Sequence, residues 1–356
     1  MSALADRLAA RTLELVNIRS ESRNEEEIAA LVLDVLGEPA WRDGETLWYE
    51  DRADGLPRIV LAGHLDTVPS QGNLPGALED GAVVGLGASD MKGGVAVMVE
   101  LGRAWREEAG EQAYALDLLF FPREELPASE SPLPHFFDSV AGVHDAGLAI
   151  LLEPTDNTIQ AGCLGNMNAR IVFHGVSGHS ARPWTAENAI EKALEGLRAF
   201  AAIEPRPVEI GGLTFTEVAT VTQIAGGIAS NVVPDRVEAV VNFRYAPDRS
   251  SSSAEAYLRS LVPNGAEYVP EGDSPPARVV TDSALVQRLR AAGSFALEPK
   301  QAWTNVADFT SRGIDAVNLG PGATRYAHRR DERVEIVELE RTYEALWAFL
   351  TGSVSV

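Results

Sequence analysis

The sequence predicts an α/β fold with a mostly parallel sheet and helices on both faces, into which a smaller α+β domain is inserted. Three observations support this prediction. Several strand-sized segments are apolar almost without interruption, as expected of strands covered on both faces. Segments with helical periodicity separate them. In the middle of the chain the order of patterns changes, and the first order returns near the end.

The first part of the chain supplies the alternating strands and helices. Residues 1–20 have the periodicity of an amphipathic helix. The apolar runs at 58–64, 114–124 and 147–154 predict buried strands, and residues 90–108 predict a helix between two of them. This alternation is typical of a parallel sheet with helices on both sides.

The middle of the chain follows a β-α-β-β-α-β order, which is typical of a ferredoxin-like domain with helices on one face of an antiparallel sheet. A helix at 283–293 and a strand at 315–322 then restore the first pattern. We therefore expect one domain from residues 1–165 and 283–356 and an inserted domain from residues 166–282. The elements expected in the inserted domain are a strand at 168–175, a helix at 188–203, strands at 215–227 and 236–247, a helix at 253–262 and a strand at 277–282.

Composition restricts the class of protein and of partner. The 356 residues are 45% hydrophobic and 23% charged, the usual proportions of a globular protein. A formal net charge of −22 disfavours nucleic acid and anionic membranes as partners. We find neither a secretory leader at the start nor an apolar run near the ~18 residues of a membrane span. The single cysteine, Cys163, excludes an intrachain disulfide and fits a reducing compartment, so we expect a cytoplasmic protein.

Acidic and imidazole side chains follow the predicted strands of the larger domain. In open α/β sheets the ligand crevice lies beyond the carboxyl ends of the strands, so these side chains should converge there. Converging carboxylates repel one another and are costly to desolvate unless cations offset their charge. The residues concerned are His64, Asp66, Asp90, Glu124, Glu125, Glu153 and His328.

This set of side chains predicts a metal centre. Two imidazoles with several carboxylates suit zinc and, less selectively, cobalt or manganese. His64 and Asp66 are two residues apart, so in an extended chain both leave the same face, and Asp66 can orient the ring of His64. Glu124 and Glu125 would point to opposite faces of an extended chain, so that one could bind metal while the other acts as a base.

Each residue has a simpler interpretation when taken alone. A histidine after a strand is more often structural than a ligand, and a pair of glutamates more often belongs to a solvated surface. It is their shared position after strands that favours a metal centre. A hydrolase with a serine nucleophile is disfavoured because the sequence contains no G-x-S-x-G motif.

Eight motifs follow one another along the chain in a recognisable order. Together they resemble the dinuclear zinc metallopeptidase family that includes aminoacylases, glutamate carboxypeptidases, acetylornithine deacetylases and succinyl-diaminopimelate desuccinylases. The resemblance covers nearly the whole chain, and residues 152–190 look most like the desuccinylases of actinobacterial type. The motifs are GHLDTVP, GASDMKGG, REELPASE, LLEPTDN, GHSARP, GGIASNVVPD, NFRYAP and AHRRDE.

The resemblance implies a zinc-peptidase-like catalytic domain with two zinc ions and a role for each candidate residue. Asp90 would bridge the two ions, and the peptide bond from Asp90 to Met91 would be cis. Asp66 would orient His64, and Glu124 would be the general base. The remaining ligands would be His64 and Glu153 for one ion, and Glu125 and His328 for the other.

The resemblance also implies that residues 166–282 form a lid and the interface of a homodimer. His179 would reach the active site of the partner subunit and help to polarise the scissile carbonyl. Asn231 and Arg244 match positions that bind the carboxylate end of the substrate, and the fork of an arginine suits a carboxylate. Arg182 and Gly320 are further candidates for contact with the substrate.

The activity that this resemblance implies is hydrolysis of N-succinyl-LL-2,6-diaminopimelate to succinate and LL-2,6-diaminopimelate, a step of lysine and diaminopimelate biosynthesis. Within the same family, the protein could instead deacylate another N-acyl amino acid such as acetylornithine, or act as a carboxypeptidase or dipeptidase. A relative that binds without catalysis is disfavoured because every ligand position and the base position are filled.

Overall fold

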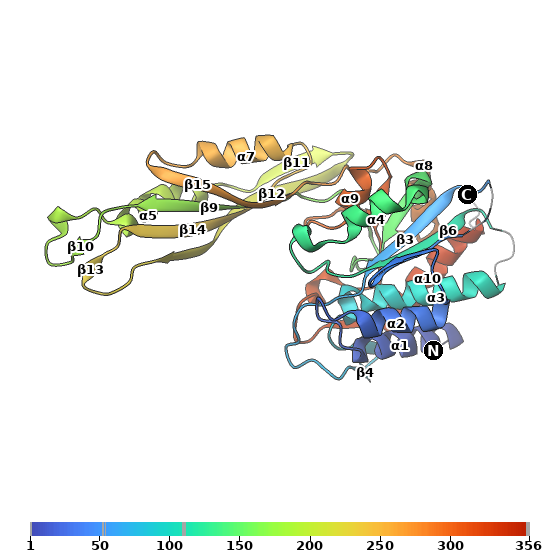
Figure 1. Cartoon of the computed structure of the whole chain (residues 1–356). Helices are drawn as coiled ribbons and strands as arrows, with labels where there is room; N and C mark the ends of the chain where they lie inside the picture. Colours follow the sequence, from blue (N-terminus) through green and yellow to red (C-terminus); the bar gives the residue numbers. More distant parts are fainter. Residues whose placement is uncertain (1, 52, 54, 109–111, 354–356) are drawn as a thin grey trace. The chain divides into compact units, whose positions relative to one another are not determined.

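A computed structural model describes residues 2–51, 53, 55–108 and 112–353, and the chain divides into two compact units (Figure 1). The first unit contains Met1–Ala161, Val280–Glu298 and Asp308–Val356, and the second contains Gly162–Val279 and Pro299–Ala307. Residues 299–307, which the sequence analysis assigned to the larger domain, thus belong to the second unit.

An eight-stranded sheet forms the centre of the first unit. Its four central strands β6, β3, β7 and β17 are parallel, whereas β1 and β2 on one side and β8 on the other are antiparallel to their neighbours. The expected parallel sheet is therefore its centre, and the sheet as a whole is mixed. The order is β1 (Trp41–Asp43), β2 (Thr46–Tyr49), β6 (Ala115–Phe121), β3 (Arg58–His64), β7 (Ala146–Leu151), β17 (Ala316–Asn318), β8 (Ile159–Ala161) and β16 (Leu297–Pro299).

Helices cover both faces of this sheet, as adjacent residues of β2 demonstrate. Trp48 lies 5.4 Å, between ring centroids, from Phe136 of α4 (Leu133–Ser139). The ring of Tyr49, the next residue, lies under the guanidinium of Arg106 in α3 (Gly93–Glu108). Because successive side chains of a strand point to opposite faces, α4 and α3 lie on opposite sides of the sheet.

The first helix of this unit forms from an amphipathic segment that begins with a capping residue. In α1 (Ala3–Asn17) the N-cap Ser2 accepts a hydrogen bond from the backbone N–H of Ala5, which supplies an acceptor that the first turn lacks. Figure 1 shows α1, α2, α3 and α10 gathered on one side of the sheet. The helices not yet delimited are α2 (Glu26–Leu36), α8 (Ala284–Gly293), α9 (Val306–Thr310) and α10 (Ile336–Thr351).

The second unit is an antiparallel sheet with its helices packed on one face. In β14 (Arg236–Arg244) every second residue from Val237 to Phe243 is buried, so one face of the strand packs in the core. The core joins these residues to Phe200 and Leu258 of the helices. The elements are β9 (Asn166–His174), β11 (Arg206–Ile210), β12 (Leu213–Gly226), β15 (Ala266–Ser274), α5 (Ala189–Gly196), α6 (Arg198–Ala201) and α7 (Ser251–Ser260).

The strand order β12-β14-β9-β15 is that of a ferredoxin-like sheet, and β11 adds a fifth strand beside β12. One predicted strand is wrong. Residues 277–282 form only an isolated bridge at Ala277, and the strand beside β9 is instead β15. Ala277 and Val280 are buried apolar residues of a loop, which explains why the pattern resembled that of a strand.

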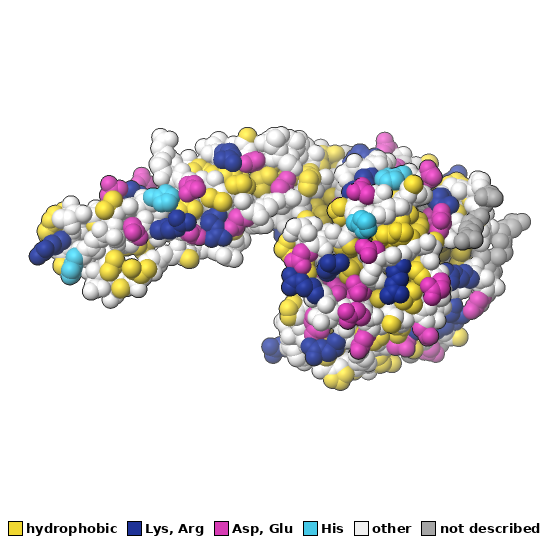
Figure 2. All heavy atoms as spheres, viewed as in Figure 1, with side chains coloured by type: hydrophobic (Ala, Val, Ile, Leu, Met, Phe, Trp, Pro, Cys, Tyr) yellow, Lys and Arg dark blue, Asp and Glu magenta, His cyan; other side chains and the backbone are white. Residues whose placement is uncertain are grey.

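Charged side chains of both signs are interspersed on the face drawn in Figure 2. Several arginines form salt bridges with carboxylates, for example Arg23 with Glu130 and Arg329 with Asp331. Within the described part of the chain, we find no helix with the length and apolarity needed to cross a membrane.

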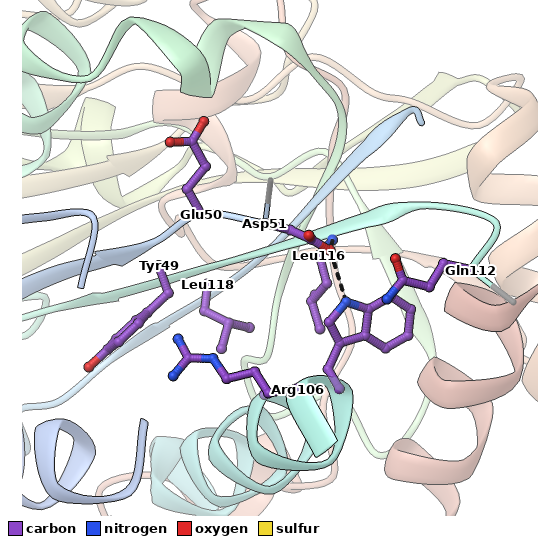
Figure 3. Close-up of a pocket in the computed structure, with 9 residues that line it drawn as sticks. Tyr49, Glu50, Asp51, Arg106, Gln112, Leu116 and Leu118 are labelled. Atoms are coloured by element: carbon purple, nitrogen blue, oxygen red, sulfur yellow. Dashed lines mark hydrogen bonds between the residues drawn. The ribbon is translucent and has the colours of Figure 1, made fainter. Parts of the chain in front are cut away.

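A buried ion pair ties the start of β3 to β6. The carboxylate of Asp117 is fully buried and accepts hydrogen bonds from Arg58 Nε (2.8 Å) and Nη2 (2.7 Å) and from the backbone N–H of Asp51 (2.8 Å). Asp51 in turn accepts the indole N–H of Trp105, beside a pocket at the start of β6 (Figure 3). Burial raises the pKa of Asp117 to about 6 against the opposing effect of Arg58.

We expect the substitution Arg58→Met to lower the free energy of unfolding by about 3 kcal/mol at pH 8, because it leaves a buried carboxylate without its counter-charge. The loss should shrink as the pH falls towards 5. Without Arg58 the pKa of Asp117 rises further, and a carboxyl group with a raised pKa in the folded state adds stability as it takes up a proton. Urea unfolding at several pH values measures both effects.

The double variant Arg58→Met/Asp117→Leu is the matched control, because it removes both charges together. Its stability should exceed that of Arg58→Met at pH 8 and should lack the change between pH 8 and 5. A single variant as stable as the wild type would contradict this account of the pair.

Candidate metal centre

The side chains predicted to converge do so at the carboxyl ends of β3, β6 and β7, in the first unit. His64 is the last residue of β3, the glutamate pair follows β6 and Glu153 follows β7. Asp90 lies in the helical turn η1 (Ala88–Lys92) that precedes α3. His328 comes from the loop after β17.

His64 is buried, and both of its ring nitrogens face acceptors. Nδ1 lies 3.0 Å from the backbone oxygen of Asp66 and 3.5 Å from its carboxylate, and Nε2 lies 3.1 Å from Asp90 Oδ1. Burial lowers the pKa of His64, but the carboxylates of Asp66 and Asp90 outweigh it and raise that pKa well above its ordinary value. The ring is thus held by Asp66 on one side and directs Nε2 towards Asp90.

Asp90 is the centre of the cluster. Its two carboxylate oxygens face the two histidines, with 3.1 Å between Oδ1 and His64 Nε2 and 3.5 Å between Oδ2 and His328 Nε2. Burial would raise the pKa of Asp90, but the two imidazoles hold it below its ordinary value. The peptide bond from Asp90 to Met91 is cis, as predicted.

Asp66 organises the glutamate pair as well as His64. Its Oδ1 accepts the backbone N–H of Glu124 at 2.9 Å, and its Oδ2 accepts that of Glu125 at 3.1 Å. Ser22, which the sequence analysis did not identify, donates its hydroxyl to Oδ2 at 2.7 Å. One buried carboxylate therefore fixes the turn that carries both glutamates.

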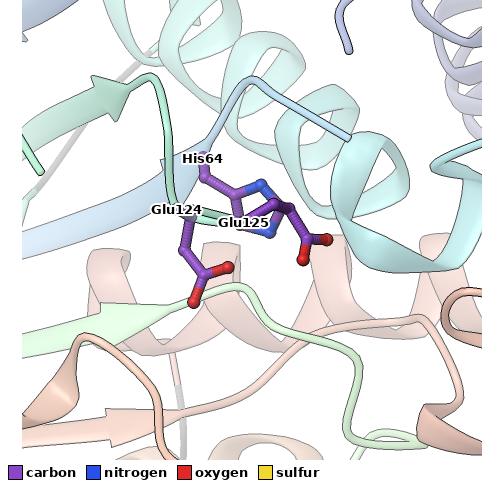
Figure 4. A group of neighbouring side chains, drawn as sticks. All are labelled: His64, Glu124 and Glu125. Atoms are coloured by element: carbon purple, nitrogen blue, oxygen red, sulfur yellow. The ribbon is translucent and has the colours of Figure 1, made fainter. Parts of the chain in front are cut away.

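Glu124 and Glu125 lie in a turn and not in an extended segment. They still diverge, as the sequence analysis expected, because the turn sends their side chains in different directions (Figure 4). One carboxylate oxygen of Glu124, one of Glu125 and one ring nitrogen of His64 all lie within 4.8 Å of one another. Burial raises the pKa of the Glu124 carboxyl well above its ordinary value.

His328 completes the opposite side of the cluster. Its Nε2 lies 2.9 Å from Glu125 Oε1, and its backbone has a positive φ of 59°. Hydrogen bonds to Asp90 and Glu125 raise the pKa of His328 to about 10. The ring therefore joins the glutamate turn to Asp90.

Two groups of possible ligand atoms share Asp90, and this arrangement suits two cations. One group contains His64, Asp90 and Glu153, and the other contains Asp90, Glu125 and His328. Within each group the ligand atoms lie within 4.8 Å of one another. Imidazoles and carboxylates in this number are a donor set that fits zinc-type ions and would offset the repulsion among the buried carboxylates.

Two glycines allow the surrounding loops to approach closely. A Cβ atom at Gly320 would lie 2.4 Å from the backbone oxygen of Glu153, and one at Gly322 would lie 2.3 Å from that of Ser89. A side chain at either position would displace a segment that carries a candidate ligand. Gly320 thus has a packing role here, beside the contact with substrate that the resemblance implies.

The candidate residues of the second unit lie in two places, around the two-stranded β10–β13 sheet and at the end of β14 in the five-stranded sheet. His179 of β10 (Gly178–His179) is opposite Val232 of β13 (Val232–Val233), and the backbone N–H of Ser180 donates to the oxygen of Asn231. Arg182 N–H donates to the oxygen of His179. His179 Nδ1 accepts the N–H of Ala181 at 3.0 Å, so the proton of the neutral ring is on Nε2.

Arg244 lies at the other end, as the last residue of β14. The pairing of β14 with β9 starts at Arg236 and His174, near β10, and runs to Phe243 and Met167. Nine residues of strand, roughly 25–30 Å, therefore separate the end with His179 from Arg244. Burial lowers the pKa of Arg244, whose Nε donates to Asn242.

Two more buried charged residues lie beside the cluster, and neither was predicted from the sequence. Glu332 is 1% exposed and belongs to the motif AHRRDE, four residues after His328. Lys92 is 1% exposed and donates to the backbone oxygen of Ile18 at 2.7 Å. Burial lowers the pKa of Lys92 to about 8, although Glu21 and Glu332 act in the opposite direction. Lys92 belongs to the motif GASDMKGG and Glu332 to AHRRDE, and this position inside a motif was the only indication that the sequence offered.

Two curated proteins resemble the chain over nearly its whole length. One, from Mycobacterium tuberculosis, has the provisional name succinyl-diaminopimelate desuccinylase DapE and is 35% identical over 96% of this chain and 97% of its own. The other, from Corynebacterium glutamicum, is named succinyl-diaminopimelate desuccinylase and is 33% identical over 96% of this chain and 95% of its own.

Solved structures share the fold at much lower identity. A tripeptidase from Staphylococcus aureus superposes with a TM-score of 0.79 at 19% identity, covering 98% of each chain. The YXEP protein of Bacillus subtilis, described as a dinuclear metal-binding peptidase, superposes with a TM-score of 0.70 at 15% identity, covering 99% of each chain. At these identities the likeness concerns the fold alone.

The family comparison covers most of the chain and agrees with the motifs. The model of peptidase family M20/M25/M40 matches residues 60–351, a span that begins in β3 and ends in α10. With this match and the two relatives above 30% identity, the chain belongs to peptidase family M20/M25/M40.

Proposed function

We propose that the protein is a dinuclear metal-dependent amide hydrolase that removes succinate from N-succinyl-LL-2,6-diaminopimelate. The observation that carries the catalytic part is the pair of ligand groups that share Asp90. The substrate is proposed from the desuccinylase names of the relatives at 33% and 35% identity, which match nearly the whole chain.

The proposed metal centre uses five ligands. Asp90 would contribute to both sites, and each of its oxygens already faces a different histidine. One site would be completed by His64 and Glu153, and the other by Glu125 and His328. Zinc is the proposed ion, with cobalt or manganese as possible substitutes, because the donors are imidazole nitrogens and carboxylate oxygens.

When bound by these residues, such ions would supply Lewis-acid chemistry, which lowers the pKa of a water molecule and polarises an amide carbonyl. The chain itself supplies the proton transfers. Glu124 would take a proton from the attacking water and deliver it to the leaving amine. Burial stabilises the protonated form of Glu124 and so raises its pKa above the value in solution. The raised pKa is closer to the range that suits a group acting as base and then as acid.

The geometry of the second unit supports a site completed by two chains. His179 belongs to the two-stranded β10–β13 sheet near the start of β14, and Arg244 is the last residue of β14. The length of β14 therefore keeps a single copy of this unit from bringing both residues to one small substrate. We therefore propose a homodimer through residues 166–282 in which His179 and Asn231 reach the partner's site. The proton on His179 Nε2 would then be available to the oxyanion. Arg182, which lies beside His179, would come from the same subunit as His179, and Arg182 and Arg244 would bind carboxylates of the substrate.

The decisive assay compares substrates on the zinc-loaded protein. We expect kcat/KM for N-succinyl-LL-2,6-diaminopimelate to exceed that for N-acetylornithine and for a simple N-acyl amino acid by about 10²-fold or more, because the site must match the succinyl carboxylate. A preference for either of the other two substrates would keep the hydrolase and reject the proposed substrate. Activity that does not depend on metal would reject the mechanism.

The substitution Glu124→Gln tests the general base. It should reduce kcat by about 10²- to 10⁴-fold, because no proton acceptor remains, while two metal ions stay bound. Metal content of the purified variant and turnover are the two measurements. The adjacent substitution Glu125→Gln is the control, which should lose metal. Retained turnover in Glu124→Gln would show that another group is the base.

Complementation between subunits tests the action of His179 in the partner. Neither Glu124→Gln nor His179→Ala should be active alone, but their co-expression should restore about a quarter of wild-type activity, because half of randomly formed dimers carry one intact site. The two variants folded separately and kept apart provide the baseline. Absence of recovery in isolated mixed dimers would place His179 in its own subunit's site, and wild-type activity of His179→Ala alone would place it outside catalysis.

A further inference from the structure

Glu332 is a buried carboxylate without a role in the proposed chemistry. It lies between His328 and β18 (Arg333–Glu335), and only 1% of its surface is exposed. A carboxylate is costly to bury unless hydrogen bonds compensate for its lost solvation. The hydrogen-bond partners of this carboxylate therefore show which part of the backbone it stabilises.

Among the described residues, the donors to its carboxylate are backbone N–H groups of residues 87–90, the turn at the start of η1 that carries Asp90. Oε2 accepts the backbone N–H of Gly87 at 2.9 Å. Oε1 accepts the backbone N–H groups of Ser89 at 3.1 Å and of Asp90 at 2.9 Å. The two oxygens are thus engaged by main-chain donors, which sets Glu332 apart from a metal ligand.

The conformation of this turn explains why it needs an outside acceptor. Asp90 (φ −122°, ψ 95°) and Met91 (φ −129°, ψ 38°) depart from helical geometry, so η1 is not a regular first turn of α3. The N–H groups at the start of a helical segment also have no acceptors within it. Glu332 supplies the acceptors that the local backbone cannot.

Further contacts join the same two segments of the chain. The backbone oxygen of Glu332 accepts the N–H of Gly85 at 2.9 Å, and Ser89 donates its hydroxyl to the oxygen of Ala323 at 2.9 Å. The loop that carries His328 is therefore docked along the turn that carries Asp90, where Nε2 of His328 lies 3.5 Å from Asp90 Oδ2.

From these contacts we infer that Glu332 is a positioning residue of the metal centre. Its carboxylate fixes the backbone of Asp90 and, through residues 328–332, the distance from Asp90 to His328. This inference rests on the proposed function, since it assigns to Glu332 the placement of two proposed ligands that are far apart in sequence. Groups that orient ligands commonly change metal affinity by about 10- to 100-fold when they are lost.

The test is metal binding to Glu332→Gln, measured by competition with a zinc chelator and by the visible spectrum of the cobalt-loaded protein. The amide has nearly the same shape, but one of its two acceptor atoms becomes a donor and meets an N–H group. We expect metal affinity to fall by about 10- to 100-fold, with an altered cobalt spectrum, while the variant remains folded by circular dichroism.

The substitution Glu100→Gln is the matched control. Glu100 is also a buried glutamate, 1% exposed, but it binds Arg7, Arg11 and Arg103 on α1 and α3. This variant should lose thermal stability in the metal-free state and keep wild-type metal affinity. If Glu332→Gln behaved in the same way, Glu332 would be structural only and the inference would be overturned.

Two further outcomes are distinguishable from these. If the wild type itself bound no metal, the proposed function would fail and not merely the role of Glu332. If Glu332→Gln did not fold, Glu332→Asp would replace it, because the shorter side chain keeps the charge but cannot reach all three N–H groups. Wild-type metal affinity in a folded Glu332→Asp variant would overturn the inference.

Discussion

The gathering of carboxylates at the carboxyl ends of β3, β6 and β7 is the constraint on which the rest of the candidate site depends. Asp66, Asp90, Glu124 and Glu153 are brought together in a buried region, where like charges repel and solvation is lost. Two imidazoles offset part of this charge, as the raised pKa values of His64 and His328 indicate. Divalent cations would offset the remainder, which is why the arrangement favours a metal centre over a structural cluster.

Two acidic side chains hold this cluster together from outside the proposed ligand set. Asp66 accepts the backbone N–H groups of Glu124 and Glu125, and Glu332 accepts those of the turn that ends at Asp90. In both cases a buried carboxylate fixes main chain, and the main chain then fixes a functional side chain. The backbone is thus fixed at the residues where a small displacement of a ligand would weaken binding of a metal ion.

The second unit contributes differently, through the length of its sheet. The length of β14 separates Arg244, at its end, from the β10–β13 pair that carries His179, so that one chain alone cannot place both at a single small substrate. The members of the metal cluster come from loops at one edge of a sheet, whereas in the proposed site these two residues would come from two copies of the chain. The proposed dimer is thus a consequence of strand length and not of a surface property.

The sequence alone determined the larger fold and the members of the cluster, because apolar runs, helical periodicity and the residues after each strand are local patterns. It misplaced a strand at 277–282, because burial of Ala277 and Val280 in a loop produces the same pattern as a strand. Only the tertiary structure decided that Asp66 holds the glutamate turn and that Glu332 holds Asp90. Those contacts join side chains to backbone groups 58 and 242 residues away, and no local pattern specifies which main-chain donors a buried carboxylate will meet.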